Sequence, residues 1–143
     1  MRFKFIPAVL GAALGSVLSP AMAWQAECKI NPMDDTQECQ ITDYDARILV
    51  FYGLAKNPAM ICVIGHDFPG RLAAIRVDKN KMLAAEHEGC MSAGSLIEQM
   101  KAGRRVKVQY YEWPYDYPKY GEASLSGFEA SLDKLRRLRG GKN

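Results

Sequence analysis

The chain has 143 residues, of which 48% are hydrophobic and 24% are charged, and its formal net charge is +3. A chain of this length is typical of a single domain and can bury about two-thirds of its unfolded surface. Two of the basic residues, Arg2 and Lys4, fall in a segment that we expect to be removed, which leaves the remainder nearly neutral. That balance disfavours a protein that binds nucleic acid by neutralising phosphates.

Residues 1–23 have the layout of a cleaved secretory signal peptide. Arg2 and Lys4 precede an apolar run over residues 5–18, and the segment closes on Ala21-Met22-Ala23. The run is shorter than the roughly 20 apolar residues of a spanning helix, so a membrane anchor is the lesser alternative. We therefore expect cleavage near Ala23-Trp24 and a periplasmic or secreted protein without a stable membrane anchor. Residues 24–138 are expected to form one β-rich domain and residues 139–143 a basic tail.

Four cysteines lie in the expected exported part, at Cys28, Cys39, Cys62 and Cys90. An even number in an exported chain indicates two disulfides, and four cysteines allow three pairings. Pairing between sequence neighbours favours Cys28–Cys39 and Cys62–Cys90. In the chain-entropy account these bonds stabilise the fold by about 3 and 3.5 kcal/mol at most.

Aspartates surround the first two cysteines, at Asp34, Asp35, Asp43 and Asp45. Calcium needs a denser pattern of oxygen ligands, with glycine at the sharp turn. We expect these carboxylates to be solvated charges in loops.

Several segments have the composition or the alternation of strands: residues 46–52, 60–64, 72–77 and 105–110. Each is rich in β-branched or aromatic residues and most are followed by turn-forming residues. Helices and strands do not alternate as parallel βαβ units require. The sequence therefore predicts a mainly antiparallel β protein, a sandwich or a partly open barrel, with two short helices.

The two helices are predicted from capping-box patterns, Ser95-Leu-Ile-Glu98 and Ser126-Gly-Phe-Glu129. The first pattern opens a helix with Leu96, Ile97 and Met100 inside, and Gly103 stands where a C-terminal cap belongs. The second precedes an apolar stripe of Phe128, Leu132, Leu135 and Leu138 that should dock on the sheet. Its other side is basic, with Lys134, Arg136, Arg137 and Arg139, as suits a helix C-terminus.

Cys62-x3-His66 and His87-x2-Cys90 have spacings that a tetrahedral zinc site could use. In an oxidising compartment, however, two neighbouring cysteines favour a disulfide over zinc. We expect no metal and no cofactor.

Motifs for nucleophilic catalysis are weak. Ser92 follows Gly89 by three residues instead of the two of a nucleophile elbow, and Ser131-Leu-Asp-Lys134 matches S-x-x-K on the predicted docking helix. Cys90 beside His87 has no identifiable third group to orient it. We expect a protein that is not an enzyme.

The stretch YYEWPYDYPKY, residues 110–120, is the most aromatic part of the chain. Alternation with the preceding residues places Tyr110 in the core and carries the strand to Trp113, where Pro114 ends it. Residues 115–121 are expected to form a loop stiffened by proline. Amphipathic aromatic side chains on such a loop are typical of interfaces, so we predict a partner surface formed by Trp113, Tyr115, Tyr117 and Tyr120. The alternative is that these rings fold back as a lid over the core.

The order of the motifs WQAECKINPMDDTQECQIT, RVDKNK, GCMSAGSLIEQMKAGRRVKVQY and ASLSGFEASLDKL resembles the invasion-associated locus B family of exported Gram-negative bacterial proteins. The resemblance spans most of the expected mature chain and implies an exported β-rich fold linked to host-cell invasion or envelope adaptation. No catalytic residue belongs to the family pattern. The family places two cysteines close together around its G-C element, whereas residues 86–89 here contain none. The resemblance therefore implies that Cys62 supplies the partner of Cys90.

Signal, size, cysteines and resemblance together predict an exported, non-enzymatic binding or adaptor protein whose partner is an unidentified protein or envelope component. The alternative is an inhibitor or immunity protein that neutralises an envelope-acting enzyme or toxin by inserting a loop into its cleft. A role in invasion does not follow from similarity at the level of the fold.

Overall fold

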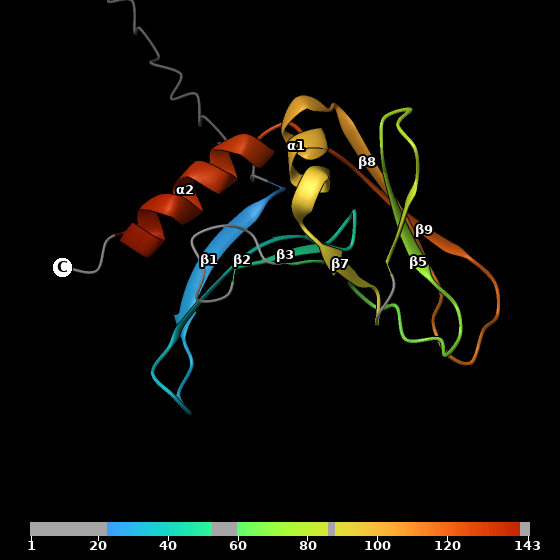
Figure 1. Ribbon diagram of the computed structural model, residues 1–143, viewed down its shortest axis with the longest axis horizontal. Coiled ribbons are helices and arrows are strands. Elements are labelled where there is room, and N and C mark those ends of the chain that lie inside the picture. The colour runs from blue at the N-terminus through green and yellow to red at the C-terminus, as the bar shows by residue number, and fades with distance from the viewer. Residues whose placement is uncertain (1–22, 53–59, 86–87, 141–143) are drawn as a thin grey trace, which may run out of the picture.

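The computed structural model describes residues 23–52, 60–85 and 88–140, and within these ranges it contains two antiparallel sheets and two helices (Figure 1). The first sheet has the order β1-β2-β3-β4-β7, formed by β1 (Gln25–Ile30), β2 (Gln37–Asp43), β3 (Ile48–Tyr52), β4 (Met60–Val63) and β7 (Cys90–Ser92). The second has the order β6-β5-β8-β9, formed by β6 (Leu83–Ala85), β5 (Ala73–Val77), β8 (Arg105–Tyr110) and β9 (Lys119–Ser124). The sheets do not close into a barrel, so the prediction of a mainly antiparallel, sandwich-like fold is confirmed.

The third strand begins later than expected. The sequence predicted a strand from residue 46, but β3 starts at Ile48 because the preceding residues form a turn. The Asp43 carboxylate accepts a 2.8 Å hydrogen bond from the Ala46 N–H, and Arg47 has a φ of 55°. A left-handed residue cannot extend a strand ladder, so pairing with β2 starts only after Arg47.

Both disulfides connect residues that lie directly opposite each other in antiparallel pairs. Cys28 faces Cys39 across β1 and β2, and Cys62 faces Cys90 across β4 and β7. The Cα atoms are 4.0 Å apart in each pair. The predicted pairing of sequence neighbours is therefore confirmed, and each bond fixes the register of the two strands that it joins.

The helices are α1 (Gly94–Ala102) and α2 (Phe128–Gly140). Ser95 does not cap α1, because the helix begins one residue earlier and the Ala93 carbonyl already accepts from the Ile97 N–H. The first turn of α2 is likewise held by backbone groups, with the Phe128 and Ser131 N–H groups donating to the Leu125 and Gly127 carbonyls. Both predicted helices exist, but the proposed side-chain caps are wrong.

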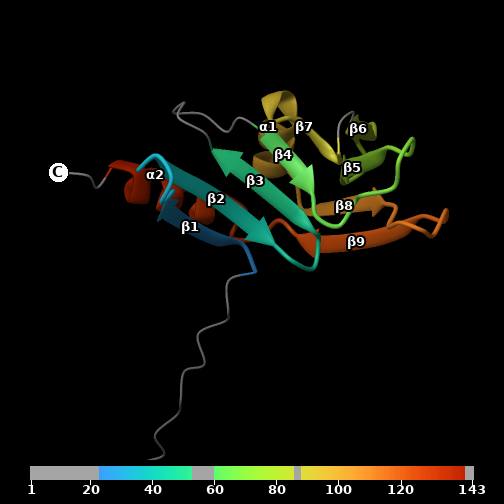
Figure 2. The ribbon, with the colours of Figure 1, turned by 90° about the horizontal axis from the view of Figure 1, so that it is seen from below.

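Helix α2 lies beside β1 and β2 and presents its apolar side to them (Figures 1 and 2). Phe128, Leu132 and Leu135 are buried as predicted, whereas Leu138 is 40% exposed. The rings of Phe128 and Trp24 meet edge to face with centroids 4.9 Å apart. Because the helix continues to Gly140, Arg139 belongs to it and not to a loose tail.

The rest of the core is formed by the facing apolar residues of the two sheets and by Leu96, Ile97 and Met100 of α1. Neither helix in the described ranges is long and apolar enough to cross a membrane. Residues 1–22 of the predicted signal peptide lie outside the described residues.

Candidate binding surface at the aromatic end

Three of the four residues whose spacing could suit zinc have other partners. Cys62 and Cys90 are bonded to each other, so neither offers a thiolate to a metal or acts as a nucleophile. His66 uses both ring nitrogens on backbone groups, and His87 lies outside the described residues. Across the parts of the chain that the structure describes, no three potential metal ligands gather.

The two serine motifs also have plain structural explanations. Ser131 is fully buried, and its hydroxyl donates a 2.7 Å hydrogen bond to the Trp24 carbonyl. That bond ties α2 to the residue before β1, and it occupies the hydroxyl that an S-x-x-K mechanism would need. Ser92 lies exposed at the end of β7.

The aspartates divide into solvated and buried groups. Asp34 is exposed, and hydrogen bonds from the Thr36 hydroxyl and backbone N–H lower its pKa. Asp43 is buried, contrary to the expectation of a solvated charge, because it lies on the inner face of β2 beside Ile41. Burial raises the pKa of Asp43, and its Oδ2 has no hydrogen-bond partner among the described residues.

The aromatic stretch is arranged differently from the prediction. Tyr110 is buried as expected, but β8 ends there and does not reach Trp113. Residues 111–118 connect β8 to β9, and Tyr120 lies on β9 opposite Gln109 instead of in the loop. The strand stops because the backbone after Tyr110 bonds to a different segment: the Tyr111 N–H donates to His66 Nδ1, and the Tyr111 carbonyl accepts from the Asp67 N–H.

Two loops therefore meet at the end of the molecule that lies farthest from α2 (Figure 2). One is the 64–72 loop, which follows β4, and the other is the 111–118 loop. We call the surface formed by Phe68, Tyr111, Trp113, Tyr115 and Tyr117 the aromatic end. The Phe68 and Trp113 rings are 5.3 Å apart, and those of Tyr115 and Tyr117 are 5.8 Å apart.

The rings of the aromatic end are available to a partner. Trp113 is 62% exposed, Tyr115 54% and Tyr117 52%. Rings with more than half of their surface in solvent do not close over the core, so the arrangement disfavours the lid interpretation. Tyr120 is 70% exposed but points from the outer face of the second sheet, which separates it from the loop tyrosines.

Directional bonds hold the aromatic end in place. The Trp113 N–H donates to the Asp67 carboxylate at 2.7 Å, and the Tyr115 N–H donates to the Glu112 carbonyl at 2.8 Å. Arg71 donates two hydrogen bonds, of 2.6 and 2.8 Å, to the Asp116 carboxylate. This pairing holds the pKa of Asp116 below its ordinary value. A paired guanidinium and carboxylate fix geometry better than a single bond does. The rings are thus presented on ordered loops.

Charged side chains fill the space behind the rings. Glu112 pairs with Lys119 and with Arg47, whose guanidinium lies 3.4 Å from the carboxylate and 4.7 Å from the centre of the Tyr110 ring. The hydrogen bond to Glu112 raises the pKa of Lys119, whose ammonium lies 5.9 and 6.0 Å from the centres of the Tyr115 and Tyr117 rings. Glu112 therefore offsets one of the two positive charges that lie beside these rings.

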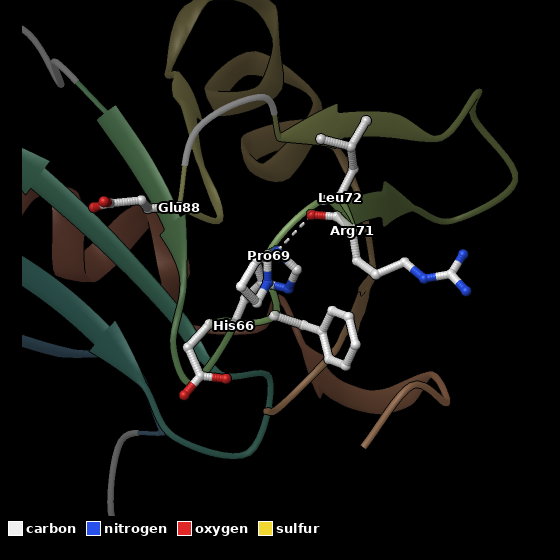
Figure 3. Close-up of a pocket in the computed structure, with 8 residues that line it drawn as sticks. His66, Pro69, Arg71, Leu72 and Glu88 are labelled. Atoms are coloured by element: carbon white, nitrogen blue, oxygen red, sulfur yellow. Dashed lines mark hydrogen bonds between the residues drawn. The ribbon is translucent and has the colours of Figure 1, made fainter. Parts of the chain in front are cut away.

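Beside the rings is a hollow of about 630 Å³ (Figure 3). It is lined by the 64–72 loop, with His66 and Phe68 on it, and by Glu88 from the turn before β7. The His66 ring donates from Nε2 to the Arg71 carbonyl, 3.0 Å away, while the Arg71 side chain points away from the ring (Figure 3).

Sequence reasoning missed the contribution of the 64–72 loop. Its signal was Phe68, a large apolar residue placed between Asp67 and Pro69-Gly70 in a turn-rich stretch, where exposure is the natural expectation. Nothing in the spacing of residues 66–71 and 111–116 shows that the two loops meet.

Comparisons with protein-family models, curated proteins and solved structures returned no match for this chain.

Proposed function

We propose that this protein is an exported, non-enzymatic binding protein that contacts its partner through the aromatic end. The observation that carries the proposal is the exposure of Trp113, Tyr115 and Tyr117 on loops fixed by directional bonds. Tryptophan and tyrosine are the residues that contribute most to protein interfaces. A surface that is ordered before binding also loses less conformational entropy on association.

Export is the second part of the proposal. The two disulfides are consistent with an extracytoplasmic protein, since such bonds persist in oxidising compartments. Together with the expected signal peptide they support a periplasmic or secreted location. The resemblance to the invasion-associated locus B family remains a prediction, as does any link to the envelope or to host cells.

A second candidate function is an inhibitor or immunity protein that blocks an envelope-acting enzyme or toxin. It is favoured by the position of the 111–118 loop at one extremity of the molecule (Figure 2). A projecting ordered loop with aromatic side chains can enter a cleft in a partner, whereas an adaptor needs no such projection.

The test is capture from envelope extracts by purified wild-type protein and by the double variant Tyr115→Ala/Tyr117→Ala. We expect the double variant to lose at least about tenfold in capture with an unchanged melting temperature, because the rings contribute to binding and not to the core. Met33→Ala is the matched control, since Met33 is 89% exposed in the turn between β1 and β2. Equal capture by wild type and double variant contradicts the proposal.

The identity of the captured material separates the two functions. A single enzyme bound in stoichiometric amount, whose turnover falls when the protein is added, supports the inhibitor. Cell-wall or outer-membrane components support the adaptor. A hydrolase activity of the purified protein that disappears in Ser92→Ala contradicts both.

A further inference from the structure

We propose that His66 is a proton-operated latch for the aromatic end, closed when its ring is neutral and opened when the ring gains a second proton. The inference concerns regulation of the surface described above, and its biological meaning rests on the proposed function. His66 touches none of the exposed rings of Trp113, Tyr115 and Tyr117. It is a positioning residue that acts through the backbone of Tyr111.

The hydrogen bonds of His66 admit only one form of the ring. Its Nδ1 lies 3.1 Å from the backbone nitrogen of Tyr111, and a backbone N–H can only donate, so Nδ1 carries no hydrogen. Its Nε2 lies 3.0 Å from the Arg71 carbonyl oxygen, which can only accept, so Nε2 carries one. The neutral ring with hydrogen on Nε2 satisfies both partners. The opposite neutral tautomer and the imidazolium ion do not.

The latch joins the two loops of the aromatic end at their roots. Next to the bond between His66 and Tyr111, the Asp67 N–H donates to the Tyr111 carbonyl and the Asp67 carboxylate accepts from the Trp113 N–H. A proton on Nδ1 would set two N–H groups against each other across 3.1 Å. The backbone from Tyr111 to Trp113 then has to withdraw, and Trp113 leaves its place against Phe68.

On one side His66 is packed against the chain at Gly89. His66 is only 9% exposed, and Gly89 lies against it so closely that a Cβ atom there would be 3.0 Å from the His66 Cβ. The open side of the ring is the hollow shown in Figure 3. Once the 111–118 loop withdraws, water from that hollow can solvate the charged ring.

The other titratable and charged groups around the latch are already engaged or face solvent. In the 64–72 loop they are Asp67, bonded to the Trp113 N–H, and Arg71, paired with Asp116 of the 111–118 loop; Tyr111 accepts from Gln109 through its hydroxyl. Behind them Glu112 is paired with Arg47 and Lys119, and Glu88 lies exposed in the turn before β7. Histidine is the side chain of this set that ordinarily changes charge between about pH 5 and 8.

Thermodynamic linkage fixes the direction of the effect. Because opening takes up one proton, the ratio of open to closed molecules rises as the pH falls, by at most about tenfold for each unit of pH. Acidification therefore favours the open form of the aromatic end.

The test is a pH titration of the isotopically labelled protein by NMR from pH 8 to pH 5. At pH 8 the nitrogen shifts of the His66 ring should show hydrogen on Nε2 and none on Nδ1. On acidification the amide signals of Tyr111 and Trp113 and the Trp113 indole signal should move with the same midpoint as the ring. The Trp24 indole, buried and bonded to the Ser124 carbonyl, is the internal control and should not follow.

Two variants isolate the responsible histidine. His66→Gln supplies an amide that donates and accepts but does not titrate, so the Trp113 signals should stay near their pH 8 positions throughout. His87→Gln removes the chain's other histidine and should leave the wild-type profile intact. If His66→Gln does not fold, the wild-type ring still decides the question. A ring with hydrogen on Nδ1 at pH 8, or Trp113 signals that do not follow the ring, overturns the latch.

The latch and the proposed function can be contradicted independently of each other. The NMR titration uses the protein alone and needs no partner, whereas the capture experiment with Tyr115→Ala/Tyr117→Ala needs no change of pH. Where capture depends on the two tyrosines, wild type should capture less at pH 5.5 than at pH 7.5, by up to about tenfold. His66→Gln should capture equally at both pH values. Equal capture by wild type at the two pH values overturns regulation by the latch and leaves the proposed function standing.

Discussion

In this protein, whether a polar side chain is buried depends more on the face of the strand on which it lies than on its residue type. Asp43 ends β2 and Asp45 lies two positions later in the following turn, yet Asp43 is buried and Asp45 is exposed. The difference arises because Asp43 is the last inward-facing residue of β2, after Cys39 and Ile41. Burying a carboxylate costs free energy unless its oxygen atoms accept hydrogen bonds. Here Oδ1 accepts from the Ala46 N–H, whereas Oδ2 has no partner among the described residues.

Asp43 should make folding stability depend on pH. Desolvation raises its pKa above the ordinary value of 3.8, so the folded chain binds this proton more tightly than the unfolded chain. Its stabilising contribution is therefore complete below pH 3.8 and is lost as the pH rises through the raised folded pKa. Each unit of the rise corresponds to about 1.4 kcal/mol. Urea unfolding of wild type and Asp43→Asn should be measured from pH 3 to pH 7. The free energy of unfolding of the wild type should fall relative to that of Asp43→Asn as the pH increases.

Asp35→Asn is the control for that measurement, because Asp35 is exposed in the turn between β1 and β2 and asparagine tolerates its φ of 56°. Its stability should run parallel to that of wild type. Parallel curves for Asp43→Asn as well would show that the buried carboxyl is not the source of the pH dependence.

At the scale of elements, the parts predictable from sequence are those that bury one face regularly. Residues 105–110 alternate polar and apolar side chains, and β8 occupies the same range. β9, with the sequence KYGEAS, has no comparable signal and becomes a strand because it pairs with β8 along its whole length. Gly121 in it is required by packing, since a Cβ there would lie 2.9 Å from the Asp45 carbonyl oxygen.

Prediction from sequence has the same limit for the candidate site at the aromatic end. The exposed rings of Trp113, Tyr115 and Tyr117 could be predicted from their local sequence. What orders them could not, because Arg71 and Asp116 are 45 positions apart and meet only after both sheets have formed. Local sequence thus identifies the candidate surface, whereas its rigidity depends on the tertiary fold.

The pair formed by Arg71 and Asp116 should control how firmly the two loops are held. Asp116→Asn removes the charge that Arg71 grips, and an exposed pair contributes little to global stability. We expect faster amide hydrogen exchange at Asp67, Trp113 and Tyr115, by about threefold to tenfold, with a melting temperature within about 2 °C of wild type. Asp133→Asn breaks a comparable exposed pair with Arg136 on α2 and should leave those amides unchanged. Unchanged exchange in Asp116→Asn would show that the remaining backbone bonds suffice.

At the scale of the whole molecule, the two disulfides stabilise different parts of the first sheet. Cys28–Cys39 fixes β1 on β2, beside which α2 lies, and Cys62–Cys90 fixes the short β7 on β4. β4 leads into the 64–72 loop, and the turn before β7 carries Gly89, against which His66 packs. The second disulfide therefore supports the aromatic end as well as the sheet, while the first is remote from it.

Removing each disulfide should separate these roles. In the chain-entropy account Cys28→Ala/Cys39→Ala, which opens a span of 11 residues, costs at most about 3 kcal/mol of unfolding free energy. Cys62→Ala/Cys90→Ala opens a span of 28 and costs at most about 3.5 kcal/mol. Such a small difference in urea unfolding does not separate the bonds, so the decisive readout is local. Only the second variant should lose the Trp113 signals typical of the closed loops under conditions where both variants are folded. Closed loops in both variants would show that the 64–72 loop needs no covalent support.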